Sequence, residues 1–152
     1  MTIAVSGLEE NKALAGTELG HTDWLEITQD RVNVFGEATG DLQWIHVDVE
    51  RAKAGPFGGP IAHGYLTLSL IIPLFNDLLV IDGITMSVNY GLNKVRFPAP
   101  VPVGSKVRLR GDVAEVNDVK GSGVEMTLNF AVEIEGCEKP ACVAQAVYRH
   151  YA

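Results

Sequence analysis

A long apolar segment near the middle of the chain restricts its possible folds more than any other feature. Residues 65–81 read YLTLSLIIPLFNDLLVI. The segment is short for a membrane span and carries several polar residues, so it predicts a buried helix that begins near His63 and Gly64. A helix that is apolar on nearly every face is enclosed by other structure. Because Pro73 has no N–H for the Ser69 carbonyl, we expect a kink or break between these two residues.

Strand patterns in the second half of the chain predict what encloses this helix. Residues 124–134 alternate strictly between apolar and polar, residues 106–113 do the same, and residues 141–151 are rich in small and β-branched side chains. In residues 84–97 the apolar set changes phase, which predicts a bulge near residues 91–94 that returns it to the core. The sequence therefore predicts an α+β fold, with a curved antiparallel sheet wrapped around one long central helix.

The length of 152 residues fits one domain, and no linker or repeat divides the chain. We expect residues 1–152 to form this single domain, with residues 1–16 as a loosely fixed lead-in. Thr28 is typical of a helix start and Gly40 of its end, and Asp48 can cap a short helix that runs to Ala54. Glycines and prolines make residues 55–60 an irregular loop.

Charge and cysteine content exclude several classes of function. The net charge is −7 and no basic stripe is present, which argues against a nucleic-acid partner. The spacing of Cys137 and Cys142 fits neither a zinc knuckle nor a redox pair, and the N-terminus has no basic start followed by an apolar core. We therefore expect a cytoplasmic protein with no membrane partner.

An acid and an imidazole lie five positions apart in the stretch GDLQWIH, residues 40–46. If one loop holds both, Asp41 and His46 can share a water molecule and move its proton. Asp after Gly is also an ordinary turn or cap residue, and a lone His is often structural, so both interpretations stand at this point. His63, at the start of the central helix, more often caps or packs than reacts.

Three stretches carry a resemblance to a known family. Residues 35–46, FGEATGDLQWIH, resemble the signature of the MaoC-like, or hydratase 2, branch of the hot-dog-fold proteins. GPIAHG at residues 59–64 resembles the start of the hot-dog helix, and VRFPAPV at residues 95–101 resembles its strand-to-turn segment. Gln43 and Trp44 stand where the common pattern has Asn-Pro, a variation of a mycobacterial-type subgroup close to nodulation-protein-like members.

The resemblance implies a hot-dog fold and a hydro-lyase of fatty acid metabolism. Such an enzyme hydrates trans-2-enoyl-CoA to (R)-3-hydroxyacyl-CoA, or runs the reverse dehydration, without metal or cofactor. Asp41 is then the base on water, and His46 orients that water and relays the proton. The Gly64 N–H donates a hydrogen bond to the thioester oxygen as it gathers negative charge, and Gln43 holds the loop or the water.

The implied partners are an acyl-CoA thioester, or the same acyl group on an acyl carrier protein, and a second copy of the chain. Hot-dog domains commonly join edge to edge as homodimers. Residues 84–90 fit such an edge, because their polar face carries only small uncharged side chains.

Other functions are compatible with the same residues. A hot-dog acyl-CoA thioesterase would share the fold and the ligand but direct water at the carbonyl carbon, and the nearby Asp/His pair favours the hydratase. A non-catalytic acyl-CoA-binding or protein-binding module is a second alternative, to which the replaced Asn-Pro pair gives some weight, but the retention of both Asp41 and His46 argues against it. A metal hydrolase built on Asp41, His46 and His63 is weaker, because no tight two-His spacing supports it.

Overall fold

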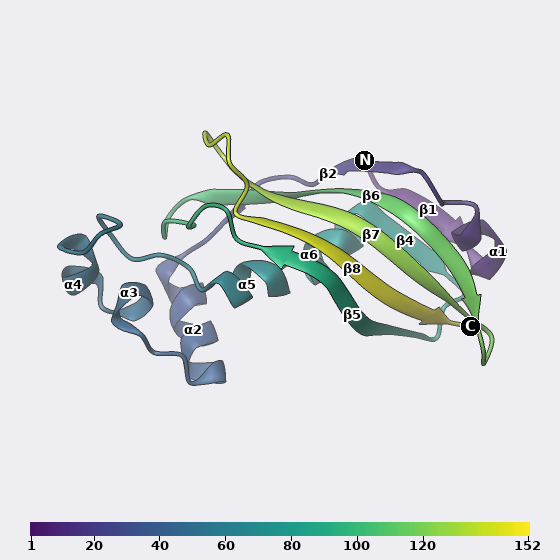
Figure 1. Cartoon of the computed structure of the whole chain (residues 1–152), viewed down its shortest axis with the longest axis horizontal. Coiled ribbons are helices and arrows are strands. Elements are labelled where there is room, and N and C mark those ends of the chain that lie inside the picture. The colour runs from purple at the N-terminus through teal and green to yellow at the C-terminus, as the bar shows by residue number, and fades with distance from the viewer.

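The longest strands form one antiparallel sheet. A computed structural model describes residues 1–152 and shows this sheet curving over a pair of short helices (Figure 1). The strand order is β2-β6-β7-β8-β5, and β3 also pairs with β6. The bounds are Glu18–His21 for β2, Leu25–Glu26 for β3, Met86–Arg96 for β5, Lys106–Val119 for β6, Gly123–Ile134 for β7 and Cys142–Tyr151 for β8. This is the predicted curved antiparallel sheet.

Strand β7 shows why the sheet forms. Its even-numbered residues from Val124 to Ile134 are at most 4% exposed and face the helices. Phe130 on β7 meets Phe75 of the helices with ring centroids 5.5 Å apart in a T-shaped contact. An alternating strand buries one complete face in this way, because successive side chains point to opposite sides. The period of two in the sequence is thereby confirmed.

The central helix is broken. It consists of α5, Gly64–Ser69, and α6, Ile71–Leu78, with Leu70 between them. Pro73 lies in the first turn of α6, where its missing N–H has no intrahelical partner to lose. The predicted interruption is therefore confirmed. The predicted enclosure is not complete, because Tyr65 is 71% and Ile72 37% exposed.

The N-terminus differs from the expected loose lead-in. Strand β1, Ile3–Ser6, pairs in parallel with β4, Leu79–Asp82, and helix α1, Gly7–Lys12, follows. Asn11 is fully buried, and Leu14 is only 6% exposed. The expectation was wrong because the partner of β1 is hidden at the end of the apolar run, where the sequence reads as a continuation of the helix.

Three helices form one end of the molecule, away from the paired strands β1 and β4 (Figure 1). They are α2, Gln29–Thr39, α3, Trp44–Val47, and α4, Val49–Lys53. The Thr28 side chain accepts a hydrogen bond from the Arg31 N–H, Gly40 ends α2 with a φ of 79°, and Asp48 caps α4. These caps were predicted, whereas α3 was not. None of the helices combines the length and apolar character needed to cross a membrane.

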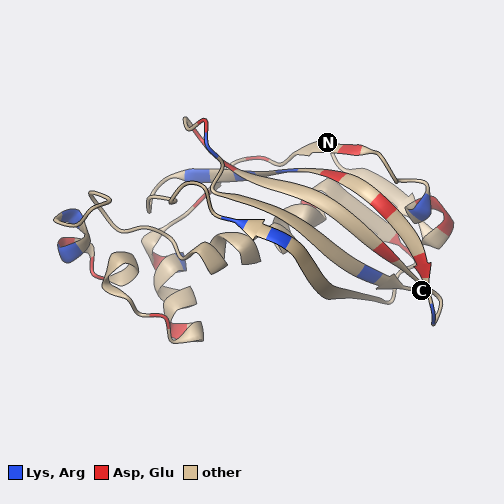
Figure 2. Cartoon of the chain, in the orientation of Figure 1, with Lys and Arg blue, Asp and Glu red and all other residues tan.

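Strand β5 is an edge strand with an irregular register. The register shifts between Asn89 and Gly91 and again between Leu92 and Lys94, which confirms the predicted bulge. The even-numbered apolar residues were expected to face the core, and this was wrong for Met86, Val88 and Tyr90, which are 39% to 59% exposed; Leu92, 47% exposed, does line a cavity against the helices. Only β8 lies beside β5, so the opposite edge of β5 remains unpaired. Charge on β5 is confined to its basic end, as Figure 2 shows.

Candidate active site

The backbone around Gly40 brings the two predicted reacting residues onto one short stretch. Gly40 adopts the left-handed conformation that ends α2, and Asp41 follows directly. The Gln43 carbonyl then accepts a hydrogen bond from the His46 N–H at 3.0 Å, within the first turn of α3. The Gln29 side chain donates to the His46 carbonyl at 2.8 Å and so fastens α3 to α2.

The imidazole of His46 is held in one orientation. It is 6% exposed, and its Nδ1 lies 2.7 Å from the Ile61 carbonyl oxygen. A carbonyl can only accept, so Nδ1 carries the proton and Nε2 of the neutral ring keeps a free lone pair. Burial lowers the pKa of His46, and neighbouring His63 lowers it further, against opposing contributions from the Ile61 carbonyl and Asp41. His46 is thus a neutral base whose reactive nitrogen is Nε2.

The Asp41 carboxylate lies close to both histidines. A carboxylate oxygen of Asp41 and one ring nitrogen each of His46 and His63 all lie within 4.8 Å of one another. Asp41 is exposed, whereas both histidines are buried. The structure therefore brings together the predicted pair and adds His63, which sequence reasoning left aside as a cap or packing residue. The His-Gly pair at the helix start was the signal that could have pointed to it.

A cavity of about 280 Å³ opens beside His46. Gly64, the first residue of α5, lines it, and so does Thr67 one turn further on. The other lining residues are Ile61, Ala62, Phe97, Ala99, Pro100, Val101 and Ala141. The N–H of a first helical residue has no intrahelical acceptor, so the Gly64 N–H is free to meet a ligand oxygen in this cavity.

Gln43 does not occupy the position expected for it. Its side chain is exposed and makes no hydrogen bond, while its backbone nitrogen lies 3.5 Å from an Asp41 carboxylate oxygen. Neighbouring Trp44 packs against Arg51, with the guanidinium 4.3 Å from the ring centroid. A side chain on Gly55 would meet the same indole ring at 2.9 Å. Of the two residues that replace Asn-Pro, Trp44 therefore packs within the α3–α4 region.

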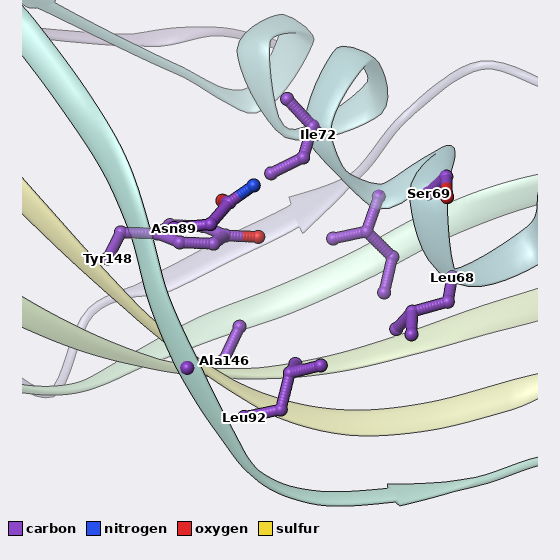
Figure 3. Close-up of a pocket in the computed structure, with 9 residues that line it drawn as sticks. Leu68, Ser69, Ile72, Asn89, Leu92, Ala146 and Tyr148 are labelled. Carbon is purple, nitrogen blue, oxygen red and sulfur yellow. The ribbon is translucent and has the colours of Figure 1, made fainter. Parts of the chain in front are cut away.

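A second cavity of about 250 Å³ lies between the helix pair and the sheet edge, on the turn of α5 that follows Thr67. Figure 3 shows Leu68 and Ile72 of the helices on one side and Leu92 of β5 on the other. Six of its nine lining residues are hydrophobic. Such a lining suits an aliphatic chain, whereas the cavity beside His46 is the one that His46 and Gly64 line.

Two imidazoles and a carboxylate are also groups that zinc binds in proteins, so Asp41, His46 and His63 could hold such an ion. In the structure, one nitrogen of each ring is used to hold the ring in place, which leaves His46 Nε2 and His63 Nδ1 with free lone pairs. Nδ1 of His46 meets Ile61, Nε2 of His63 meets the Asp41 backbone carbonyl at 2.9 Å, and the Asp41 carboxylate faces solvent. The arrangement as it stands is suited to proton transfer to and from one water molecule.

Comparison with known proteins gives consistent matches. A family model described as MaoC like domain matches residues 10–134. A 3-hydroxyacyl-thioester dehydratase Z from Mycobacterium tuberculosis is 53% identical over 140 residues, covering 92% of this chain and 93% of the relative. Nodulation protein N from Rhizobium meliloti is 42% identical over 139 residues, covering 90% and 86%. The solved (R)-hydratase from A. caviae involved in PHA biosynthesis has a TM-score of 0.72 and 25% identity, covering 88% of this chain and 94% of that one.

Proposed function

Because the chain belongs to the family of MaoC-like domains, which confirms the resemblance and the hot-dog fold, we propose that it is an (R)-specific enoyl-thioester hydratase. It is a hydro-lyase of fatty acid metabolism that adds water to a trans-2-enoyl thioester or removes it from a (3R)-hydroxyacyl thioester. One observation supports this function most: His46 keeps a free Nε2 lone pair beside a cavity lined by the helix start, and one of its ring nitrogens lies within 4.8 Å of a carboxylate oxygen of Asp41 and a ring nitrogen of His63.

The reaction follows from these groups. A water molecule between the Asp41 carboxylate and His46 Nε2 loses a proton to the pair as its oxygen bonds to C3 of the enoyl group. The π electrons of the C2–C3 double bond move toward the thioester carbonyl, and C2 then takes the proton back from the pair. One water thus supplies both the hydroxyl and the hydrogen on one face. Because Asp41 and His46 are coupled, the proton is held by the pair and is not assigned to one residue alone.

The thioester oxygen gathers negative charge while C2 is electron-rich. We assign the Gly64 N–H as its donor, because this group lines the cavity at the N-terminal end of α5. A side chain at position 64 would lie 3.4 Å from the Phe97 ring and fill the approach to the backbone. The second, apolar cavity next to Leu68 and Ile72 then takes the acyl chain. Gln43 contributes through its backbone at the start of α3, not through its side chain.

The carrier of the acyl group is coenzyme A or an acyl carrier protein, and the protein acts in the cytoplasm as a homodimer. Exposed apolar residues of the helix pair, of β5 and of the position directly after β5 support the dimer. These are Tyr65, Ile72, Met86, Val88, Tyr90, Leu92 and Phe97. An open strand edge with so much apolar surface pairs readily with a second copy.

The decisive experiment offers the purified protein crotonyl-CoA and longer enoyl-CoAs. We expect loss of the conjugated enoyl-thioester absorbance and a product of (R) configuration. Release of free thiol, with the double bond unchanged, would identify a thioesterase instead. Binding without turnover at every chain length would identify a non-catalytic module.

A further inference from the structure

His63 is the buried polar residue closest to the reacting pair that the proposed mechanism leaves without a role. It is 2% exposed, and its ring stacks on that of His46, with centroids 3.9 Å apart and an interplanar angle of 26°. The Phe35 ring packs nearby at 4.9 Å between centroids. The His63 ring is therefore fixed in place between an aromatic neighbour and the imidazole that carries the free lone pair.

One edge of the His63 ring holds the backbone of Asp41. Nε2 of His63 lies 2.9 Å from the Asp41 carbonyl oxygen, so Nε2 carries a proton and donates it. The same oxygen approaches α2 so closely that a Cβ on Gly36 would lie 2.9 Å from it. Between Gly36 and His63, the peptide after Asp41 has little freedom to shift.

Other contacts of Asp41 are too weak to fix its position. Its N–H lies 3.4 Å from the Thr39 hydroxyl, and its carboxylate lies 3.5 Å from the Gln43 nitrogen, both at the long limit of hydrogen bonding. The residue is exposed, so packing does not hold it either. His63 makes the shortest polar contact to Asp41 and at the same time supports the ring of His46.

We propose that His63 is a positioning residue of the hydration reaction, which sets the distance between Asp41 and His46 by bonding to the backbone of one and stacking on the ring of the other. This inference rests on the proposed function, because a shared water requires both groups at a fixed separation. A displacement of about 1 Å can cost roughly 10²-fold in rate. His63 does not line the cavity beside His46, and it acts through its two neighbours.

Two substitutions separate the two contacts. His63→Phe keeps an aromatic face against His46 but removes the donor to Asp41, whereas His63→Gln keeps an N–H donor near the position of Nε2 but removes the ring. We expect His63→Phe to lower kcat for crotonyl-CoA by roughly 10- to 10²-fold with a much smaller change in KM, since misplaced catalytic groups act on the chemical step. His63→Gln should recover part of the loss. His21→Phe, at an exposed histidine on β2, is the matched control and should behave as wild type.

A pH profile provides a readout that loss of packing alone would not move. The titratable groups that face His46 are Asp41 and His63, and His63 lowers the pKa of His46. Replacing His63 should therefore raise the pH at which the acid limb of kcat/KM falls. NMR titration of the His46 ring should show the same upward shift without any substrate, and thermal melting checks that each variant is folded.

The outcomes distinguish this inference from the proposed function. If wild type hydrates crotonyl-CoA and folded His63→Phe keeps kcat within about two-fold with an unchanged profile, His63 has no positioning role. Equal losses in both variants would show that the bond to Asp41 is not the important contact. If His63→Phe does not fold, His63→Gln must still shift the His46 titration. If wild type hydrates no enoyl thioester, the proposed function fails, and the NMR titration still tests the contact between the rings.

Discussion

The side chains of Asn11 and His150 meet in the interior, with Asn11 Nδ2 3.0 Å from His150 Nδ1. This contact joins α1 to β8, and both residues are at most 3% exposed. Asn11→Ala would leave His150 Nδ1 buried without its donor, so we expect the free energy of unfolding to fall by roughly 1–3 kcal/mol. Urea denaturation measures this change. Glu37→Ala, at an exposed position on α2, is the control and should stay within about 0.5 kcal/mol.

His150 should also make stability depend on pH. Burial lowers the pKa of His150 in the folded protein, whereas an unfolded histidine takes up its proton near pH ~6.5. Its contribution is therefore fully present above that pH and is lost as pH falls toward the folded pKa. His150→Gln keeps an acceptor for Asn11 but does not titrate, so its stability should fall less steeply from pH 7 to 5. Identical slopes in the two proteins would contradict this assignment.

Asp41→Asn and His46→Gln should each leave a folded protein and lower kcat by roughly 10²-fold or more. The double variant should lose far less than the product of the single losses, because both residues act on one water. Steady-state kinetics with crotonyl-CoA measures all three, with Glu37→Gln as the control. If the loss of kcat in the double variant equals the product of the two single losses, the residues do not act on a shared water. Near-normal turnover in either single variant would show that the replaced residue is structural.

The proposed reaction needs no metal ion. Protein treated with EDTA and passed through a desalting column should keep its full rate with crotonyl-CoA. Loss of activity that returns on addition of Zn²⁺ would show that Asp41, His46 and His63 bind an ion instead of a free water.

Assembly can be tested at the open edge. Light scattering at micromolar concentration should give about twice 16.4 kDa. Val88→Lys on β5 places a charge in the proposed joint and should shift the protein toward the monomer, whereas Val34→Lys, 63% exposed on α2, should not. If the wild-type protein is a monomer and fully active, the proposed dimer is wrong and a second chain contributes nothing to the active site.

Local patterns predicted the parts of the fold that local physics decides. The alternation of β7, the caps at Thr28 and Asp48 and the break before Pro73 all follow from residues close together in the chain, and all were confirmed. The irregular register of β5 was predicted from a phase change and its place at the edge from its small polar residues, but the exposure of its apolar side chains was not, because the pattern of one strand does not show which face other elements cover.

Features that depend on distant partners were missed. Strand β1 has a few apolar residues and no marked alternation, so only its pairing with β4 explains it. At the candidate site, the spacing of Asp41 and His46 in the sequence was informative. The hydrogen bond from His46 to Ile61 and the stacking of His63 on His46 arise only when the loop folds back on the start of α5.

The parallel pairing of β1 with β4 has a consequence for how the chain folds during synthesis. Ile3 leaves the ribosome early, but its partner Leu79 belongs to the segment that follows both central helices. Pairing between such distant residues closes a long loop and is slow compared with local helix formation. Residues 3–6 must therefore wait unpaired while the region that contains Asp41, His46 and His63 is already emerging. Pulse-labelling hydrogen exchange during refolding should find the amides of β1 among the last to gain protection.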